Sequence, residues 1–143
     1  MQVRLPETLQ QQIFAQLQAE YPHEGGGFLL GSVGGDTVVI SDILSVANVF
    51  EESERHHRYA MTPQDWLRME DEADARGLTI VGYFHSHPDS PAIPSEYDRE
   101  YALPNFVYLI TQVDSGAAVE MLGWRLRDDR TRFEAETLEI TTV

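Results

Sequence analysis

The stretch between Val81 and Asp98 constrains this chain most, because it places chemically reactive side chains at the end of an apolar run. Residues 78–84 are mostly apolar and rich in β-formers, and His85 and His87 follow them directly. Side chains alternate along a strand, so we expect the two imidazoles to project to the same side of a sheet. The sequence therefore predicts a strand that ends in two aligned histidines.

A proline-rich bend over residues 88–94 separates these histidines from Ser95 and Asp98. Ser95 is a good helix N-cap, and the i,i+3 spacing keeps Ser95 and Asp98 on one face of a helix start. Two imidazoles and a carboxylate that converge in this way make a three-ligand site with one position left over. Catalytic zinc has this layout, with water as the fourth ligand. We therefore expect one Zn²⁺ per chain, held by His85, His87 and Asp98.

The spacing His-x-His, seven residues, Ser, two residues, Asp resembles the signature of the JAMM (MPN+) zinc metalloproteases. That family also requires an upstream glutamate just before a glycine-rich apolar strand, and Glu24 stands at this place, in front of Gly25-Gly26-Gly27. The resemblance extends from the first expected helix to the strand after Pro104. It implies an MPN/cytidine-deaminase-like fold, in which helices flank a mixed central β-sheet. This agrees with the α/β (α+β) class that the helical and strand patterns indicate.

The length of 143 residues and the hydrophobic content of 42% favour one globular domain over residues 1–143. No apolar run approaches the ~20 residues of a membrane span, and the N-terminus lacks the apolar region of a secretory signal. The net charge of -14 argues against a nucleic-acid partner. Without cysteine, the chain can form neither disulfides nor a thiolate zinc site. We expect a cytoplasmic protein with no membrane or nucleic-acid partner.

Hydrophobic periodicity predicts the other elements. Helices are expected over residues 6–21, with Leu9, Ile13 and Leu17 on one face, and from Thr62 to about Arg76. Strands are expected over residues 28–33, 37–49, 106–110 and 118–126, and over residues 132–143, where a change of parity suggests a bulge or two half-strands. Residues 50–55 are expected to be a loop, and residues 56–59 resemble the short strand before the second helix in the family. Because His56 and His57 are adjacent, they would point to opposite faces of that strand, so we expect both to be structural or surface residues.

Glu24 and Ser95 are the candidate catalytic residues. The resemblance assigns to Glu24 the role of general base, which takes a proton from water and passes it to the leaving amine. The Ser95 hydroxyl can donate a hydrogen bond to the tetrahedral oxyanion, a role that the resemblance favours, or it can act only as the helix cap. Ser86 and Asp89 belong to the bend, and Asp89 is a candidate acceptor for a hydrogen bond from a ligand imidazole.

Members of the JAMM (MPN+) family, which this sequence resembles, cleave peptide or isopeptide bonds after the C-terminal Gly-Gly of ubiquitin or ubiquitin-like proteins. Linkage-specific deubiquitinases of the family carry sizeable insertions, whereas here residues 50–55 are short and residues 98–106 leave no room for a lid. The chain is in this respect similar to the compact stand-alone prokaryotic members. The resemblance implies a zinc-dependent peptidase or isopeptidase that acts on a small ubiquitin-like, sulfur-carrier protein, whose extended tail would add to a sheet edge.

Two alternatives come from other functional classes. Some family members have lost the metal and serve as binding scaffolds, but they generally lack part of the ligand set that this sequence keeps. A zinc aminohydrolase of the deaminase type is disfavoured, because its His-x-Glu and Pro-Cys-x-x-Cys ligands are missing. The identity of the substrate, the oligomeric state and any activating partner are not encoded in a readable motif.

Overall fold

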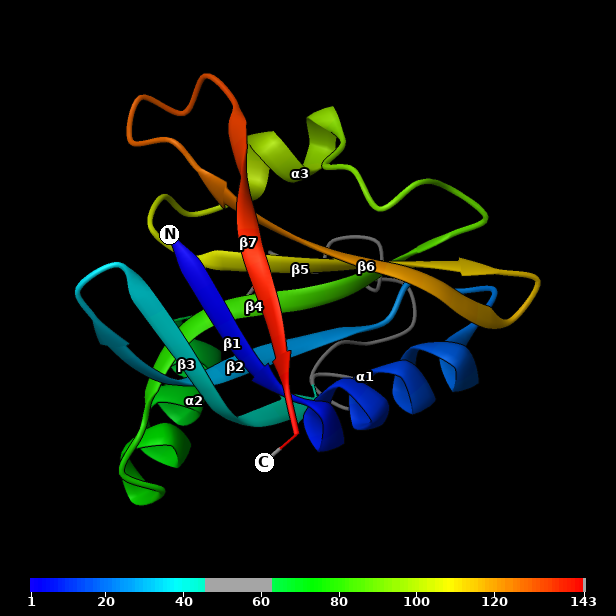
Figure 1. The fold of residues 1–143 in the computed structure, drawn as a ribbon. Helices are drawn as coiled ribbons and strands as arrows, with labels where there is room; N and C mark the ends of the chain where they lie inside the picture. The colour runs from blue at the N-terminus through cyan, green and yellow to red at the C-terminus, as the bar shows by residue number, and fades with distance from the viewer. Residues whose placement is uncertain (46–62, 143) are drawn as a thin grey trace.

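A mixed β-sheet flanked by helices forms the framework of the computed structural model, which describes residues 1–45 and 63–142 (Figure 1). In chain order the elements are β1 (Gln2–Pro6), α1 (Glu7–Glu20), β2 (Gly26–Gly34), β3 (Thr37–Ser45), α2 (Pro63–Ala75), β4 (Thr79–Pro88), α3 (Glu96–Tyr101), β5 (Val107–Asp114), β6 (Ala117–Leu126) and β7 (Phe133–Thr141). The strand order is β1-β3-β2-β4-β5-β6-β7, and β1 also pairs with β7, so the sheet closes on itself. Parallel and antiparallel pairs both occur, which confirms the expected α/β (α+β) class with a mixed sheet.

The two faces of the sheet are covered by different helices. Helix α1 places Leu9, Ile13 and Leu17 in one apolar cluster, which also contains Phe84 of β4. The other cluster contains Tyr83 together with residues of β2, β5 and β6 and the buried Met69 of α2. Because Tyr83 and Phe84 are neighbours on β4, alternation puts them on opposite faces. From Gly82 onward, the odd-numbered residues of β4 therefore face the α2 side of the sheet, and the even-numbered ones face α1. Before the register shift with β2 the order is reversed, so Val81 packs in the α1 cluster and Ile80 against the other one.

Strand β4 lies between two hydrogen-bonded neighbours, antiparallel β2 and parallel β5. The approach to β5 is close at Gly82, where an added Cβ atom would lie 2.1 Å from the carbonyl oxygen of Val107. Only a residue without a side chain fits there. The strand is buried from Val81 to His87, so its end is held firmly within the sheet.

Most predicted elements are present, but two details differ. Strand β1 was not expected; it is short, and its partners β3 and β7 come from distant parts of the sequence. Strand β7 is continuous, without the expected bulge or break. Its change of parity has another cause: Phe133 packs in the cluster on the α2 side, whereas Leu138 packs against the α1 cluster.

The expected loop at residues 50–55 and the short strand at residues 56–59 lie outside the described residues, as do residues 46–49 and the expected cap Thr62. In the described part of the chain, no helix is long and apolar enough to cross a membrane.

Candidate metal centre

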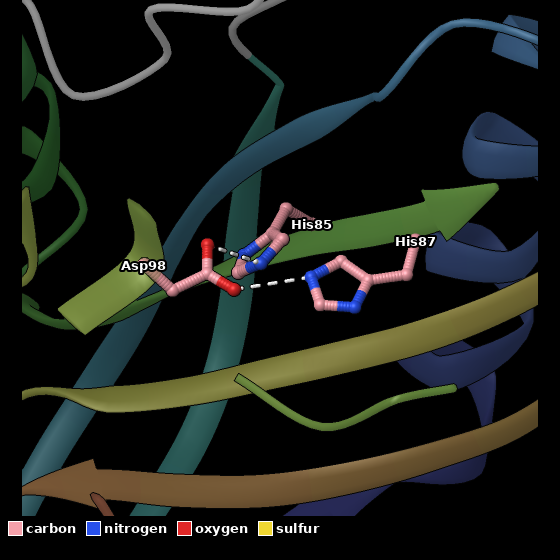
Figure 2. Close-up of side chains that lie close together, drawn as sticks. All are labelled: His85, His87 and Asp98. Atoms are coloured by element: carbon pink, nitrogen blue, oxygen red, sulfur yellow. Dashed lines mark hydrogen bonds and ion pairs between the residues drawn. The ribbon is translucent and has the colours of Figure 1, made fainter. Parts of the chain in front are cut away.

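His85 and His87 project from the C-terminal half of β4 to the same side, as strand alternation predicts (Figure 2). Their ring centroids are 5.2 Å apart. His85 is fully buried and His87 is 8% exposed. Burying two imidazoles is costly unless their ring nitrogens have partners, so the surrounding groups decide what this pair can do.

The third group, Asp98, comes from the first turn of α3. Ser95 is the N-cap of this helix, and its hydroxyl oxygen accepts a hydrogen bond from the backbone N–H of Asp98 at 3.0 Å. In return, the backbone N–H of Ser95 donates to Oδ2 of Asp98 at 2.9 Å, which completes a capping box. This reciprocal cap fixes the rotation of the Asp98 side chain.

The orientation that results brings the Asp98 carboxylate up to both imidazoles (Figure 2). Its Oδ1 atom lies 3.2 Å from Nε2 of His85, and its Oδ2 atom lies 3.1 Å from Nε2 of His87. One potential ligand atom from each residue lies within 4.8 Å of the others, and all three residues are buried. Ligand atoms at the corners of a tetrahedral zinc site, with bonds of about 2.0–2.2 Å, are roughly 3.3 Å apart. The donor set and its spacing therefore fit a zinc ion.

A hydrogen bond on the other side of His87 strengthens this conclusion. Nδ1 of His87 lies 2.8 Å from the carbonyl oxygen of Pro91, which can only accept a hydrogen bond. The Nδ1 atom must therefore carry the proton, and in a neutral His87 the lone pair on Nε2 faces the Asp98 carboxylate. Two acceptors in contact repel each other unless a cation or a second proton lies between them. The centre is thus built to hold a positive charge.

The electrostatics of His87 agree with this view. Burial by itself lowers the pKa of His87, but the hydrogen bonds to Asp98 and Pro91 and the charges of Asp98 and Glu24 outweigh it, so that the pKa is raised overall. A metal ion would take the place of the proton, which makes metal binding dependent on pH.

Glu24 and Ser95 lie at an open cleft of about 410 Å³, which His87 also lines. The residues that line this cleft are Glu24, His87, Pro88, Ser90, Pro91, Ile93 and Ser95. The structure therefore brings together, around one opening, the residues singled out in the sequence for the base and for the oxyanion donor. His85 and Asp98 do not line the cleft and are more deeply buried than His87.

Ser86 lies within β4 and not in the bend expected for it. It connects Glu24 to the histidine strand, a link that the sequence did not specify. It points to the face opposite the imidazoles, where its hydroxyl oxygen accepts a hydrogen bond from the N–H of Gly25 at 2.9 Å. The N–H of Ser86 also donates to the carbonyl oxygen of Gly25 at 3.1 Å. Gly25 follows Glu24 directly, so these bonds hold the backbone of the candidate base at a defined place beside β4. Strand alternation could have indicated this, because it predicts that Ser86 points to the face of the sheet opposite His85 and His87.

Asp89 does not have the role expected for it. Its carboxylate accepts hydrogen bonds from the hydroxyl of Tyr21 at 2.6 Å and from the N–H of Ser115 at 2.9 Å. The backbone turns at Asp89, where φ is 55°, and the side chain meets the end of α1 instead of the imidazoles. For His87, the acceptor is the carbonyl group of Pro91. A backbone acceptor in a bend leaves no signal in the sequence.

Comparison with known proteins places these observations in a wider context. Residues 6–127 match the family model described as prokaryotic homologs of the JAB domain. The chain is 35% identical over 94 residues to a desampylase of Haloferax volcanii, and the match spans 65% of this chain and 65% of that protein. The matched part is thus less than two thirds of the length of that relative.

Two solved structures share the fold. The solution structure of a protein from Salinibacter ruber has a TM-score of 0.74 and 36% sequence identity, and the match covers 99% of this chain and 92% of that one. The crystal structure of a JAB1/MPN domain protein from Archaeoglobus fulgidus has a TM-score of 0.59 and 17% identity, with 99% and 96% of the two chains covered. At this lower identity the similarity supports the fold alone.

Proposed function

The chain belongs to the family of prokaryotic homologs of the JAB domain, and from this membership we propose that it is a zinc-dependent isopeptidase or peptidase. The observation that carries this proposal is the buried group of His85, His87 and Asp98, next to a cleft that Glu24 and Ser95 line. The similarity to a desampylase supports a substrate of the small ubiquitin-like modifier class. Within this class we propose a sulfur-carrier protein that is cleaved after its C-terminal Gly-Gly.

In the proposed reaction, His85, His87 and Asp98 would hold the metal. Bound zinc would polarise the scissile carbonyl and lower the pKa of the attacking water to about 7. Glu24 takes the proton from the attacking water and delivers it to the leaving amine. Its position at the cleft beside His87 is suited to this transfer.

Ser95 can combine two roles in this mechanism. Its hydroxyl oxygen accepts the cap hydrogen bond from Asp98, and a hydroxyl that accepts one bond still has its own hydrogen to donate. We propose that it donates this hydrogen to the carbonyl oxygen on which negative charge develops. The cap and the oxyanion donor are then the same group.

The cleft also suits an extended tail that ends in glycine. Pro88, Pro91 and Ile93 form part of its wall, and Ile93 is 56% exposed. These side chains offer apolar contacts to the substrate residues that precede the Gly-Gly. We also propose that residues 1–143 form a single metalloprotease domain. We propose that the reaction takes place in the cytoplasm.

The decisive experiment combines zinc analysis with cleavage assays. The purified protein is incubated with β-grasp carrier proteins that are extended beyond Gly-Gly, and the products are identified by mass spectrometry. The wild type should bind one zinc ion and cleave after Gly-Gly. Glu24→Gln should keep the zinc ion and lose cleavage, whereas His85→Ala should lose both.

Two results would contradict the proposal. Cleavage retained by Glu24→Gln would remove Glu24 from the mechanism. A wild-type protein that binds no zinc, although its histidines are intact, would indicate a binding scaffold instead of an enzyme.

A further inference from the structure

Helix α3, which carries Asp98, is too short to be stable alone. It has six residues, and isolated helices of fewer than about 12–15 residues are marginal in water. Its N-terminal end is held by the Ser95 cap. Its C-terminal end leaves backbone carbonyl groups without partners inside the helix, as every helix does. The contacts that satisfy these carbonyl groups therefore help to decide where α3 lies.

Arg130, in the connection between β6 and β7, supplies such contacts. Its guanidinium group donates to the carbonyl oxygen of Ala102 at 2.7 Å, to that of Glu100 at 2.9 Å and to that of Arg99 at 3.3 Å. A guanidinium group is planar and has several donors in a fixed arrangement, so it can bind adjacent carbonyl groups at once. Its positive charge also interacts favourably with the C-terminal end of the helix dipole.

The interaction is reciprocal. The Arg99 side chain donates from Nη1 to the carbonyl oxygen of Arg130 at 3.0 Å. Arg130 has a φ of 61°, a backbone conformation that is unfavourable for a residue other than glycine unless the surroundings hold it. The turn that contains Arg130 is closed by its N–H, which donates to the carbonyl oxygen of Arg127 at 2.9 Å. The turn and the helix end thus hold each other.

These contacts act on the residue next to Asp98. Arg99 follows Asp98 directly, and the N–H of Ala102 donates to the carbonyl oxygen of Asp98 at 2.9 Å. A further anchor exists, because the N–H of Leu103 donates to the Tyr108 hydroxyl at 2.7 Å. Without Arg130, this anchor and the Ser95 cap would still hold the helix in place, but less tightly. The Asp98 carboxylate would then be less well fixed against the imidazoles.

We propose that Arg130 is a positioning residue for the metal centre: by binding the C-terminal carbonyl groups of α3, it fixes Asp98 against His85 and His87. The inference rests on the proposed function, in that these residues must bind a metal. Removing a group that orients a metal ligand typically lowers metal affinity by about 10–100-fold. For Arg130→Ala we expect a loss of about tenfold, at the lower end, because Arg130 acts through the helix backbone.

The test measures metal binding instead of activity. Cobalt(II) is titrated into the purified apo-protein, the visible absorption bands report coordination geometry, and zinc affinity is obtained by competition with a chelator. Arg130→Ala should bind more weakly, with weaker or shifted cobalt bands. The metal affinity of Arg130→Lys, which keeps the charge but loses the multiple donors, should lie between those of the wild type and Arg130→Ala. The matched control is Arg127→Ala, which removes ion pairs with Asp129 and Glu134 from the same connection.

Each outcome separates the inference from the function. If the wild type binds neither cobalt nor zinc, both the proposed function and the inference fail. If the wild type binds metal and a folded Arg130→Ala protein matches it in affinity and spectrum, only the inference fails. Should Arg130→Ala not fold, Arg130→Lys serves instead: it loses the multiple donors that bind the carbonyl groups of α3, and metal binding equal to that of the wild type in a folded Arg130→Lys protein would also overturn the inference.

Discussion

Strand β4 and helix α3 bring candidate metal ligands to the same centre, but they are held in different ways. Strand β4 is paired with β2 on one side and with β5 on the other, so backbone hydrogen bonds along its length fix His85 and His87. Helix α3 does not belong to the sheet and is held at its two ends, by the Ser95 cap and by Arg130. Contacts of the Ser95 and Arg130 side chains thus fix the position of Asp98, whereas strand pairing fixes the positions of the two histidines.

This difference predicts how each region responds to mutation. A ladder of backbone hydrogen bonds forms and breaks cooperatively, so damage to β4 should reduce the stability of the whole fold. The ends of a short helix can loosen locally, at a free-energy cost well below that of global unfolding. Damage around α3 should therefore affect the site more than the fold.

The largest expected effect comes from Gly82→Ala in β4. The added Cβ atom would lie 2.1 Å from the carbonyl oxygen of Val107, so β4 and β5 would have to separate. We expect the free energy of unfolding, measured with urea, to fall by about 3 kcal/mol. Gly34→Ala is the matched control, because among the described residues no atom apart from its chain neighbours lies within 4 Å of its added Cβ. Equal stability of the two variants would show that β4 is not held as tightly as we infer.

Ser86→Ala tests the link between β4 and the candidate base. The N–H of Gly25 would lose its buried acceptor, which should cost about 1–3 kcal/mol of stability. Turnover should fall, because the backbone next to Glu24 loses one of the hydrogen bonds that hold it beside β4. Zinc affinity should stay nearly constant, because Ser86 faces away from the imidazoles. Ser32→Ala, at an exposed position of β2, is the control. A loss of zinc in Ser86→Ala with turnover per bound zinc unchanged would contradict this assignment.

Substitutions of Ser95 separate its role as a cap from its role in catalysis. Ser95→Ala should lower stability by about 1 kcal/mol, whereas Ser95→Gly should cost only a few tenths, because glycine is tolerated at the N-cap. Both remove the hydroxyl group, so turnover should fall by about 10²–10³ in each if it stabilises the oxyanion. Turnover that stays near the wild-type value in Ser95→Gly would leave the serine as a cap alone. Steady-state kinetics and thermal unfolding of the two proteins supply the comparison.

The smallest effect is expected at the exposed contact between Tyr21 and Asp89. The Tyr21 hydroxyl and the Ser115 N–H hold the pKa of Asp89 below its ordinary value of 3.8. A lowered pKa means that the folded state favours the carboxylate, so this stabilisation is present above pH 3.8 and is lost as the pH falls through the lowered pKa.

Tyr21→Phe should therefore be slightly less stable than the wild type at about pH 6, and the difference should shrink by about pH 3. Denaturant unfolding at the two pH values measures it. In an Asp89→Asn background, Tyr21→Phe should show no such dependence on pH. A difference that grows on acidification would rule out this carboxylate as its source.

Part of the site could be predicted because it depends on local geometry. The shared side of His85 and His87 follows from alternation along a strand, and the cap that orients Asp98 follows from Ser95 three residues before it. The burial of Leu9, Ile13 and Leu17 follows from helical periodicity. Such relations involve residues that are near in sequence, so they can be inferred without knowing which elements pack together.

Other parts depend on partners that are distant in the sequence. Arg130 reaches the end of α3 only because the connection between β6 and β7 lies against it. The hydrogen bond between the N–H of Gly25 and the Ser86 hydroxyl oxygen requires the register of β2 on β4. Strand β1 forms only because it pairs with β3 and β7. No short sequence pattern encodes these contacts between distant residues.

The sequence by itself thus determined the donor set and the local conformations that aim it, since strand alternation and helix capping act over a few residues. Only the tertiary structure decided that Asp98 reaches both imidazoles and that Glu24 shares their cleft. The physical reason is that these distances follow from the packing of whole elements, whose free energy is a sum over contacts between distant parts of the chain.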